Sequence, residues 1–387
     1  MAQVEFSPDE LDGFAALLDG QDTHLDALSR YADVTCRALP DMGDLRAALD
    51  GLGEAHARAL QDSQSGLGRT AHWLTRAARE YRARDSEAAA SLDRVRGSAS
   101  STVPGPRAAA GSGPASMAGP AGIAGPAGIA GPAGIAGPGG LADHPGGSAP
   151  HGFLSREGGR GPDARGRLFR SDGTLALPVP EFHRHERLAR TEQRLTEHTE
   201  LWYRLTSDHL PALVTAPLAG RIERLAWLAT AYATLGAGTT AVLDTVGPGL
   251  PGWRTPAGAE FESHLRRWRT GLAGLVELDR AIAAELGRMS AEATRSAEGI
   301  LDLADDLLDG PLPRLRTLVY PDRSLKIWLV PAQTQEIYTE LRRGLALLAE
   351  IGAALAGVER AFTELADQLG QWRGACESLL SSAGRPA

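Results

Sequence analysis

The stretch that decides the fold begins with Ser7-Pro8-Asp9-Glu10-Leu11 and is interrupted once, by Leu39-Pro40-Asp41-Met42-Gly43-Asp44. Ser7 is placed to cap free backbone N–H groups, and Pro8 falls where a missing N–H costs nothing. Glu10 completes a capping box. Large apolar residues recur at helical spacing on both sides of the interruption. They are Leu11, Phe14, Leu18, Leu25, Leu28, Ala32 and Leu39 before it, and Leu45, Leu49, Leu52, Leu60, Leu67, Leu74 and Tyr81 after it. Because the connection is short, the sequence predicts an antiparallel helical hairpin over residues 1–97.

Glycines count against a regular second helix. Gly51, Gly53, Gly66 and Gly68 fall inside it, and each costs about 1 kcal/mol relative to alanine. Either packing against another chain compensates for them, or the helix is kinked or split. A two-helix hairpin also leaves part of its apolar stripe exposed, and assembly into a four-helix bundle is the usual remedy. The covering partner is a second copy, another small protein, or the C-terminal half of the same chain.

This hairpin resembles the small WXG and Esp-type substrates of bacterial type VII (ESX) secretion. The resemblance rests on the length, the tight turn at Met42-Gly43, and Tyr81-Arg82-Ala83-Arg84-Asp85, which matches the family's Tyr-x-x-x-Asp/Glu export signal. The turn departs from the family because it has no Trp-x-Gly. The resemblance implies that the secretion ATPase reads Tyr81 and Asp85, which lie on one helix face. The alternative is an ordinary interface tyrosine beside a solvated aspartate.

Tryptophans extend the resemblance into the rest of the chain. The stretch that starts at Trp253 looks like the family's turn, with Thr255 in place of glycine, so residues 195–308 resemble a second unit of this kind. Trp372-Arg373-Gly374 matches Trp-x-Gly, but too few residues follow for a returning helix. The residues expected at turns or interfaces are Met42, Gly43, Trp73, Trp253, Trp372 and Gly374.

Composition divides the chain into three predicted domains. The hairpin of residues 1–97 is followed by residues 98–165, which consist mainly of Gly, Ala, Pro and Ser. Glycine at every third position between Gly119 and Gly137 is typical of a collagen triple helix. So short a run offers no apolar burial to offset the backbone entropy of ordering, which favours a flexible linker. Residues 166–387 form a second helical module.

The second module is expected to be helical with two small β-hairpins, near 167–177 and 317–330. Helical arms are expected over residues 182–213 and 218–243. A long heptad-like helix starts at Thr255-Pro256 and continues to Leu307, and another covers 341–369. The charge-free run 225–243 has the length of a membrane span, but it consists largely of Ala, Thr and Gly, so a bundle helix is favoured. The predicted class is therefore all-α, with long antiparallel hairpins or bundles.

Chemical motifs do not assemble. The sequence contains no Gly-x-Ser-x-Gly elbow, no phosphate-binding loop and no His-Glu-x-x-His, and we predict no catalytic residues and no cofactor. His183-Arg184-His185-Glu186 lacks the three or four convergent ligands of a zinc site, so no metal is expected. A net charge of −8 argues against nucleic-acid binding. Cys36 and Cys376 are expected to pack as small apolar groups.

These observations predict a non-enzymatic type VII secretion substrate or secretion-associated protein that acts through helical contacts. Its expected partners are the secretion ATPase and either a small WXG-type protein or a second copy. The N-terminus has no Sec signal peptide. We therefore expect a cytoplasmic protein that reaches the cell surface or the medium by a non-Sec route. Two alternatives stay open, a cytoplasmic helical scaffold and the leader of a polymorphic toxin.

Overall fold

The computed structural model describes residues 7–37, 42–100, 175–183, 185–247, 249, 253, 255–319 and 334–381. The all-α prediction is confirmed, because these residues are almost entirely helical and no strand occurs among them. The chain divides into two compact units, one made of Met1–Arg84 with Pro162–Ala387 and the other of Asp85–Gly161. The predicted linker and its collagen-like repeat lie outside the described residues, except that residues 98–100 end a helix.

The N-terminal pair consists of α1 (Pro8–Thr35) and α2 (Asp44–Ser100). The capping box at the start of α1 is present: the Ser7 side chain accepts from the N–H of Asp9, and Glu10 accepts from the N–H of Ser7. Contacts between the two helices follow reverse order, since Arg82 pairs with Asp9 whereas Ser29 donates to the carbonyl of Ala57. We call these two helices the α1–α2 pair.

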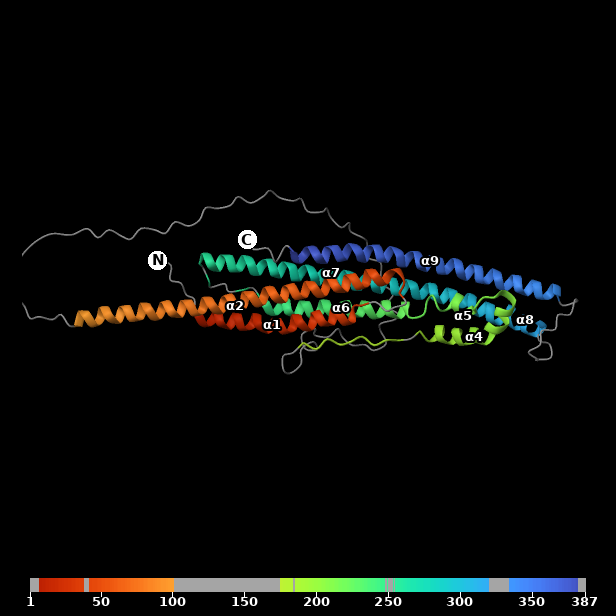
Figure 1. Cartoon of the computed structure of the whole chain (residues 1–387), viewed down its shortest axis with the longest axis horizontal. Coiled ribbons are helices and arrows are strands. Elements are labelled where there is room, and N and C mark those ends of the chain that lie inside the picture. The colour runs from red at the N-terminus through yellow and green to blue at the C-terminus, as the bar shows by residue number, and fades with distance from the viewer. Residues whose placement is uncertain are drawn as a thin grey trace, which may run out of the picture. The chain divides into compact units, whose positions relative to one another are not determined.

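Two helices from the C-terminal half cover the apolar stripe of the α1–α2 pair. They are α6 (Arg221–Val246) and α7 (Pro256–Asp309), which pack on each other, with α6 also against α1 (Figure 1). The cap predicted at Thr255 is present. Because α6 buries residues on several sides, its charge-free sequence is that of a bundle helix. In the described part of the chain, no helix has both the length and the apolar character to cross a bilayer.

The helix α2 continues without a break through Gly51, Gly53, Gly66 and Gly68. A Cβ atom added at Gly66 would lie 1.9 Å from Cζ2 of Trp268 on α7, so the indole occupies the space that any side chain would need. At Gly51 the guanidinium of Arg373 approaches in the same way. Close packing within the same chain therefore offsets the intrinsic cost of glycine in a helix.

The C-terminal half of α7 packs against a second group of helices. These are α4 (Glu186–Thr206), α8 (Pro311–Val319) and α9 (Thr334–Ser381), while α5 (Leu210–Val214) packs on α4 and α9. The prediction of one continuous helical arm over residues 182–213 is wrong, because α4 and α5 are separate helices. Ser207 adopts a left-handed conformation with φ of 68° and ends α4, and the proline at the start of α5 begins a new turn.

The β-hairpin predicted over 317–330 is wrong at its first strand. Thr317, Leu318 and Val319 belong to α8, because Leu312, Leu315 and Val319 are buried at helical spacing. Residues 320–333, which carry the remainder of that prediction, lie outside the described residues. Of the hairpin predicted over 167–177, the described residues 175–177 contain one bridge residue, Leu175, and no strand.

Candidate functional site

The predicted export residues lie on α2, one on each side of the boundary between the two units. Tyr81 is half-buried and packs against the edge of the hydrophobic core. Its neighbour Arg82 forms ion pairs with Asp9 and Asp12 of α1, at 2.6 and 2.5 Å. In the second unit, Asp85 is exposed. The tyrosine is thus neither fully exposed nor a fully enclosed core residue.

Two of the predicted interface tryptophans meet although they are far apart in the sequence. The ring of Trp73 on α2 lies 5.8 Å from that of Trp253, which precedes α7. Trp73 also stacks on Phe261 of α7 at 6.4 Å, and Phe261 contacts Phe14 of α1 edge to face. Trp253 is buried, whereas Trp73 is 43% exposed. This aromatic cluster joins α1, α2 and α7 and presents one indole to solvent.

The other predicted turn residues divide into two groups. Met42 is buried in the core and Gly43 has φ of 55°, which a turn at the start of α2 requires. Trp372 and Gly374 instead lie inside α9, where the tryptophan is half-buried and the glycine exposed. The Trp-x-Gly match in α9 is therefore not at a turn.

The two histidines before α4, His183 and His185, contact different partners. His185 caps α4, with Nδ1 accepting from the N–H of Leu188, and its Nε2 lies 3.2 Å from Glu298 of α7. His183 is exposed beside Glu181. Within the described ranges, no group of three or more His, Cys, Asp or Glu residues is arranged to hold a metal ion.

The most unusual polar site is a buried ion pair that the sequence analysis did not select. Nε2 of His56 on α2 lies 2.6 Å from Oδ1 of Asp279 on α7, and both residues are fully buried. On the other side of the imidazole, Sγ of Cys376 on α9 lies 3.8 Å from Nδ1. The ring of Tyr232 on α6 packs edge to face on the imidazole at 5.7 Å. Four helices therefore meet at His56.

Burial and the neighbouring charges have opposite effects on the pKa values of His56 and Asp279. Burial has the largest single effect on the pKa of His56 and lowers it, but the charge of Asp279, its hydrogen bond and the neighbouring Cys376 together raise that pKa to about 10. Burial raises the pKa of Asp279, and the attraction to His56 offsets only part of that rise. The pKa of Tyr232 is raised well above its ordinary value, first by burial and then by the nearby Cys36 and Asp279. The imidazolium and the carboxylate are thus the charged pair, and the tyrosine stays neutral.

Cysteine, histidine and aspartate in this order are also the components of a nucleophilic triad. Here Cys376 and its two companions are enclosed by four helices, so a substrate carbonyl has no path to Sγ while the bundle is closed. Both Cys36 and Cys376 are free and buried. The arrangement supports a structural or conformational role for the charge pair.

A signal for this pair exists in the sequence. The buried stripe of α2 passes from Leu52 to Leu60 through His56, and that of α7 passes from Leu275 to Ile282 through Asp279. One basic and one acidic residue at core positions of two separate helices are expected to pair, because an unpaired buried charge is costly.

A second set of charges joins α4 to the C-terminal end of α7. Arg187 pairs with Glu298, with Asp302 at 2.5 Å and with Asp305 at 2.9 Å. Arg194 pairs with Asp305 at 2.8 Å and with Asp309 at 2.5 Å. We call this set the α4–α7 ladder. The acidic side chains of Asp302 and Asp309 are mostly exposed, and they also hold α4 against α7.

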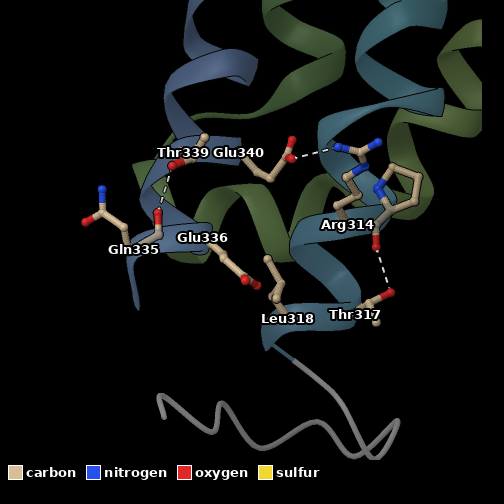
Figure 2. A pocket seen from close by; sticks show the side chains of 8 residues that line it. Arg314, Thr317, Leu318, Gln335, Glu336, Thr339 and Glu340 are labelled. Atoms are coloured by element: carbon tan, nitrogen blue, oxygen red, sulfur yellow. Dashed lines mark hydrogen bonds and ion pairs between the residues drawn. The ribbon is translucent and has the colours of Figure 1, made fainter. Parts of the chain in front are cut away.

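A pocket of about 540 Å³ opens between α8 and α9 (Figure 2). Its lining residues are Pro313, Arg314, Thr317, Leu318, Gln335, Glu336, Thr339 and Glu340. Arg314 and Glu340 form an ion pair across it at 3.0 Å. Glu336 adds a further carboxylate, so the charged groups of the lining are one guanidinium and two carboxylates.

We compared the chain with models of protein families, with curated proteins and with solved structures, and none of the three comparisons finds a match.

Proposed function

We propose that this protein is a non-enzymatic type VII secretion substrate or secretion-associated protein, in which the helix carrying Tyr81 and Asp85 docks to the secretion ATPase. The observation that carries the proposal is the state of Tyr81, whose ring packs at the edge of the core and still reaches solvent. A fully buried ring would be inaccessible to a receptor, and a detached one would have no fixed position. The four-residue spacing to Asp85 adds a carboxylate on the same helix.

The packing of the α1–α2 pair is a second observation that supports the proposal. A helical hairpin of the WXG or Esp type needs a cover for its apolar stripe, and α6 and α7 of the same chain provide one. The chain then needs neither a second copy nor a small WXG-type partner for that purpose. The secretion ATPase is the one external partner that the proposal requires.

Export can be tested in a bacterial host with an active type VII system. We expect Tyr81→Ala and Asp85→Ala to reduce the protein in the medium to the background level while it accumulates in cells. Tyr81→Phe, which keeps the ring, should be exported better than Tyr81→Ala. The matched controls are Tyr338→Ala and Asp93→Ala, which remove an exposed tyrosine and an exposed aspartate elsewhere. Wild-type export of both signal variants would refute the proposal.

A cytoplasmic scaffold is the second candidate, and exposed apolar side chains on α9 favour it. Tyr338 is 59% exposed and Leu345 is 44% exposed. A scaffold would stay in the cell and form a stable oligomer, which light scattering on the purified protein measures. Replacing both residues with Ser would then yield a monomer. An exported monomer would exclude this candidate.

A further inference from the structure

The two halves of the chain meet at a buried charge. His56 belongs to the N-terminal α1–α2 pair, whereas Asp279 and Cys376 come from α7 and α9 of the C-terminal half. The carboxylate lies 2.6 Å from Nε2, and none of the three side chains reaches solvent. Removing two charges from water costs several kcal/mol per ion, and only their mutual attraction offsets it. Removing one charge while the other remains therefore weakens the contact between the halves at this point.

The remaining polar groups around His56 cannot replace the imidazolium. From α6, Tyr232 presents a neutral phenol, and the end of α1 adds the thiol of Cys36. Burial raises the pKa of Cys36, so that thiol also stays neutral. From α9 comes the thiol of Cys376. If His56 loses its proton, Asp279 becomes a buried carboxylate without the one cation that acts on it among the described residues.

A further cation whose pKa is shifted, Arg224, lies among the described residues near this region. Arg224 of α6 donates to the backbone carbonyls of Thr35 and Arg37 at the end of α1, and its guanidinium covers the ring of Trp227 at 3.5 Å. Burial lowers the pKa of Arg224 to about 10. It joins α6 to α1 and interacts electrostatically with Cys36 and Asp50, so an experiment must separate its titration from that of His56.

We propose that His56 and Asp279 form a proton-dependent lock, which keeps α2 against α7 and α9 while the imidazole is protonated and lets α2 separate from them when that proton passes to solvent. The proposal concerns the protein as a folded chain and does not rest on the proposed function.

The direction of the effect follows from proton linkage. The folded-state pKa of His56, about 10, lies above the ordinary value of 6.5 that applies when the halves are apart. The separated state therefore releases the proton more readily, and each rise in pH between these two values favours separation. The lock is closed at pH 6.5 and opens as the pH approaches 10.

Distance measurements between spin labels test the proposal on the full-length protein. Glu54→Cys on α2 and Ala375→Cys on α9 place labels on two exposed positions of neighbouring helices, while the native cysteines are buried. At pH 6.5 we expect one short distance. As the pH is raised stepwise to just above 10, a long-distance population should grow to more than half of the molecules.

The matched control is the double variant His56→Gln/Asp279→Asn, which replaces the charges with neutral amides of similar size. It should keep the short distance over the whole range. If the labelled wild type keeps one distance at every pH, or if both proteins respond equally, the proposal is wrong; an equal response would identify Arg224. A measurement without substitutions is the NMR titration of His56, and a pKa near 6.5 in the folded protein would also overturn the proposal.

Discussion

The His56–Asp279 pair and the α4–α7 ladder both connect α7 to other helices, and they differ in burial and in the number of ion pairs. The His56–Asp279 pair is a single contact that is fully buried. The α4–α7 ladder contains five ion pairs, and the side chains of Asp302 and Asp309 are mostly exposed. Exposed pairs contribute about 0–1 kcal/mol each and weaken with salt. A buried pair contributes little net stability but becomes very costly when one partner is removed. The comparison teaches that burial, more than the number of pairs, decides which junction the fold depends on.

The largest expected effect comes from breaking the buried junction on one side. Asp279→Leu should lower the free energy of unfolding by about 3–5 kcal/mol, because it leaves the His56 charge buried without a partner. The double variant His56→Leu/Asp279→Leu should recover most of the lost free energy of unfolding, because apolar packing replaces two desolvated charges. Its stability can exceed that of the wild type. Urea unfolding of the two variants measures this. A double variant as unstable as the single one would show that the pair is net stabilising.

The second prediction separates the junctions by their response to pH. The unfolding free energy should fall by about 1.4 kcal/mol per pH unit between 6.5 and about 10, because the folded state retains the His56 proton that the unfolded state releases. In the α4–α7 ladder, hydrogen bonds to Asp305, Asp302 and Glu298 raise the pKa of Arg187, so this side chain stays charged throughout the range. Arg187→Ala should therefore lower the free energy of unfolding at every pH without changing its dependence on pH. His56→Gln/Asp279→Asn should instead make that dependence weaker. Urea unfolding at several pH values compares the slopes.

The third prediction concerns how closely α2 approaches α7 at Gly66, about three helical turns from the buried pair. Gly66→Ala should cost about 1–3 kcal/mol, because the new methyl group would overlap the ring of Trp268. The control is Gly68→Ala on the same helix, where the nearest atom to a new Cβ, on Asp22, is 3.8 Å away. This change should stabilise the protein by about 1 kcal/mol through helix propensity. Thermal unfolding of both variants gives the difference, and equal effects would contradict the close approach.

The smallest effect is expected at the exposed junction. Arg187→Ala should cost about 1 kcal/mol or less at low ionic strength, and this cost should shrink in 1 M salt, where the screening length is about 3 Å. Arg190→Ala is the control, since Arg190 has one ion pair, to Glu186 at 4.0 Å. A large, salt-independent loss for Arg187→Ala would place the ladder in the same class as the buried pair.

Local signals in the sequence account for most of the helices. The capping residues Ser7 and Thr255 start α1 and α7 where the sequence indicates, and apolar periodicity predicts the long helices. It also predicts helix where α9 forms. The strand expected at 317–319 failed because β-branched residues there have a second, helical pattern that tertiary packing selects.

The candidate sites were less predictable, because they depend on contacts between distant parts of the chain. Tyr81 was selected from a local spacing, and the exposure of its ring could not be read from that spacing. The approach of Trp73 to Trp253 depends on how α2 lies against the start of α7. His56 and Asp279 each stand out as a polar residue in an apolar stripe, but their pairing requires the register between two helices that a long segment separates in the sequence.

The cover that α6 and α7 give to the α1–α2 pair has a consequence during translation. The first helices leave the ribosome well before the residues that bury their apolar faces, since α7 ends only at Asp309. At about 5–20 residues per second, synthesis of the intervening chain takes on the order of ten seconds or more. During that interval the nascent protein exposes an apolar surface. A chaperone or transient collapse must shield this surface until the second half has been synthesised.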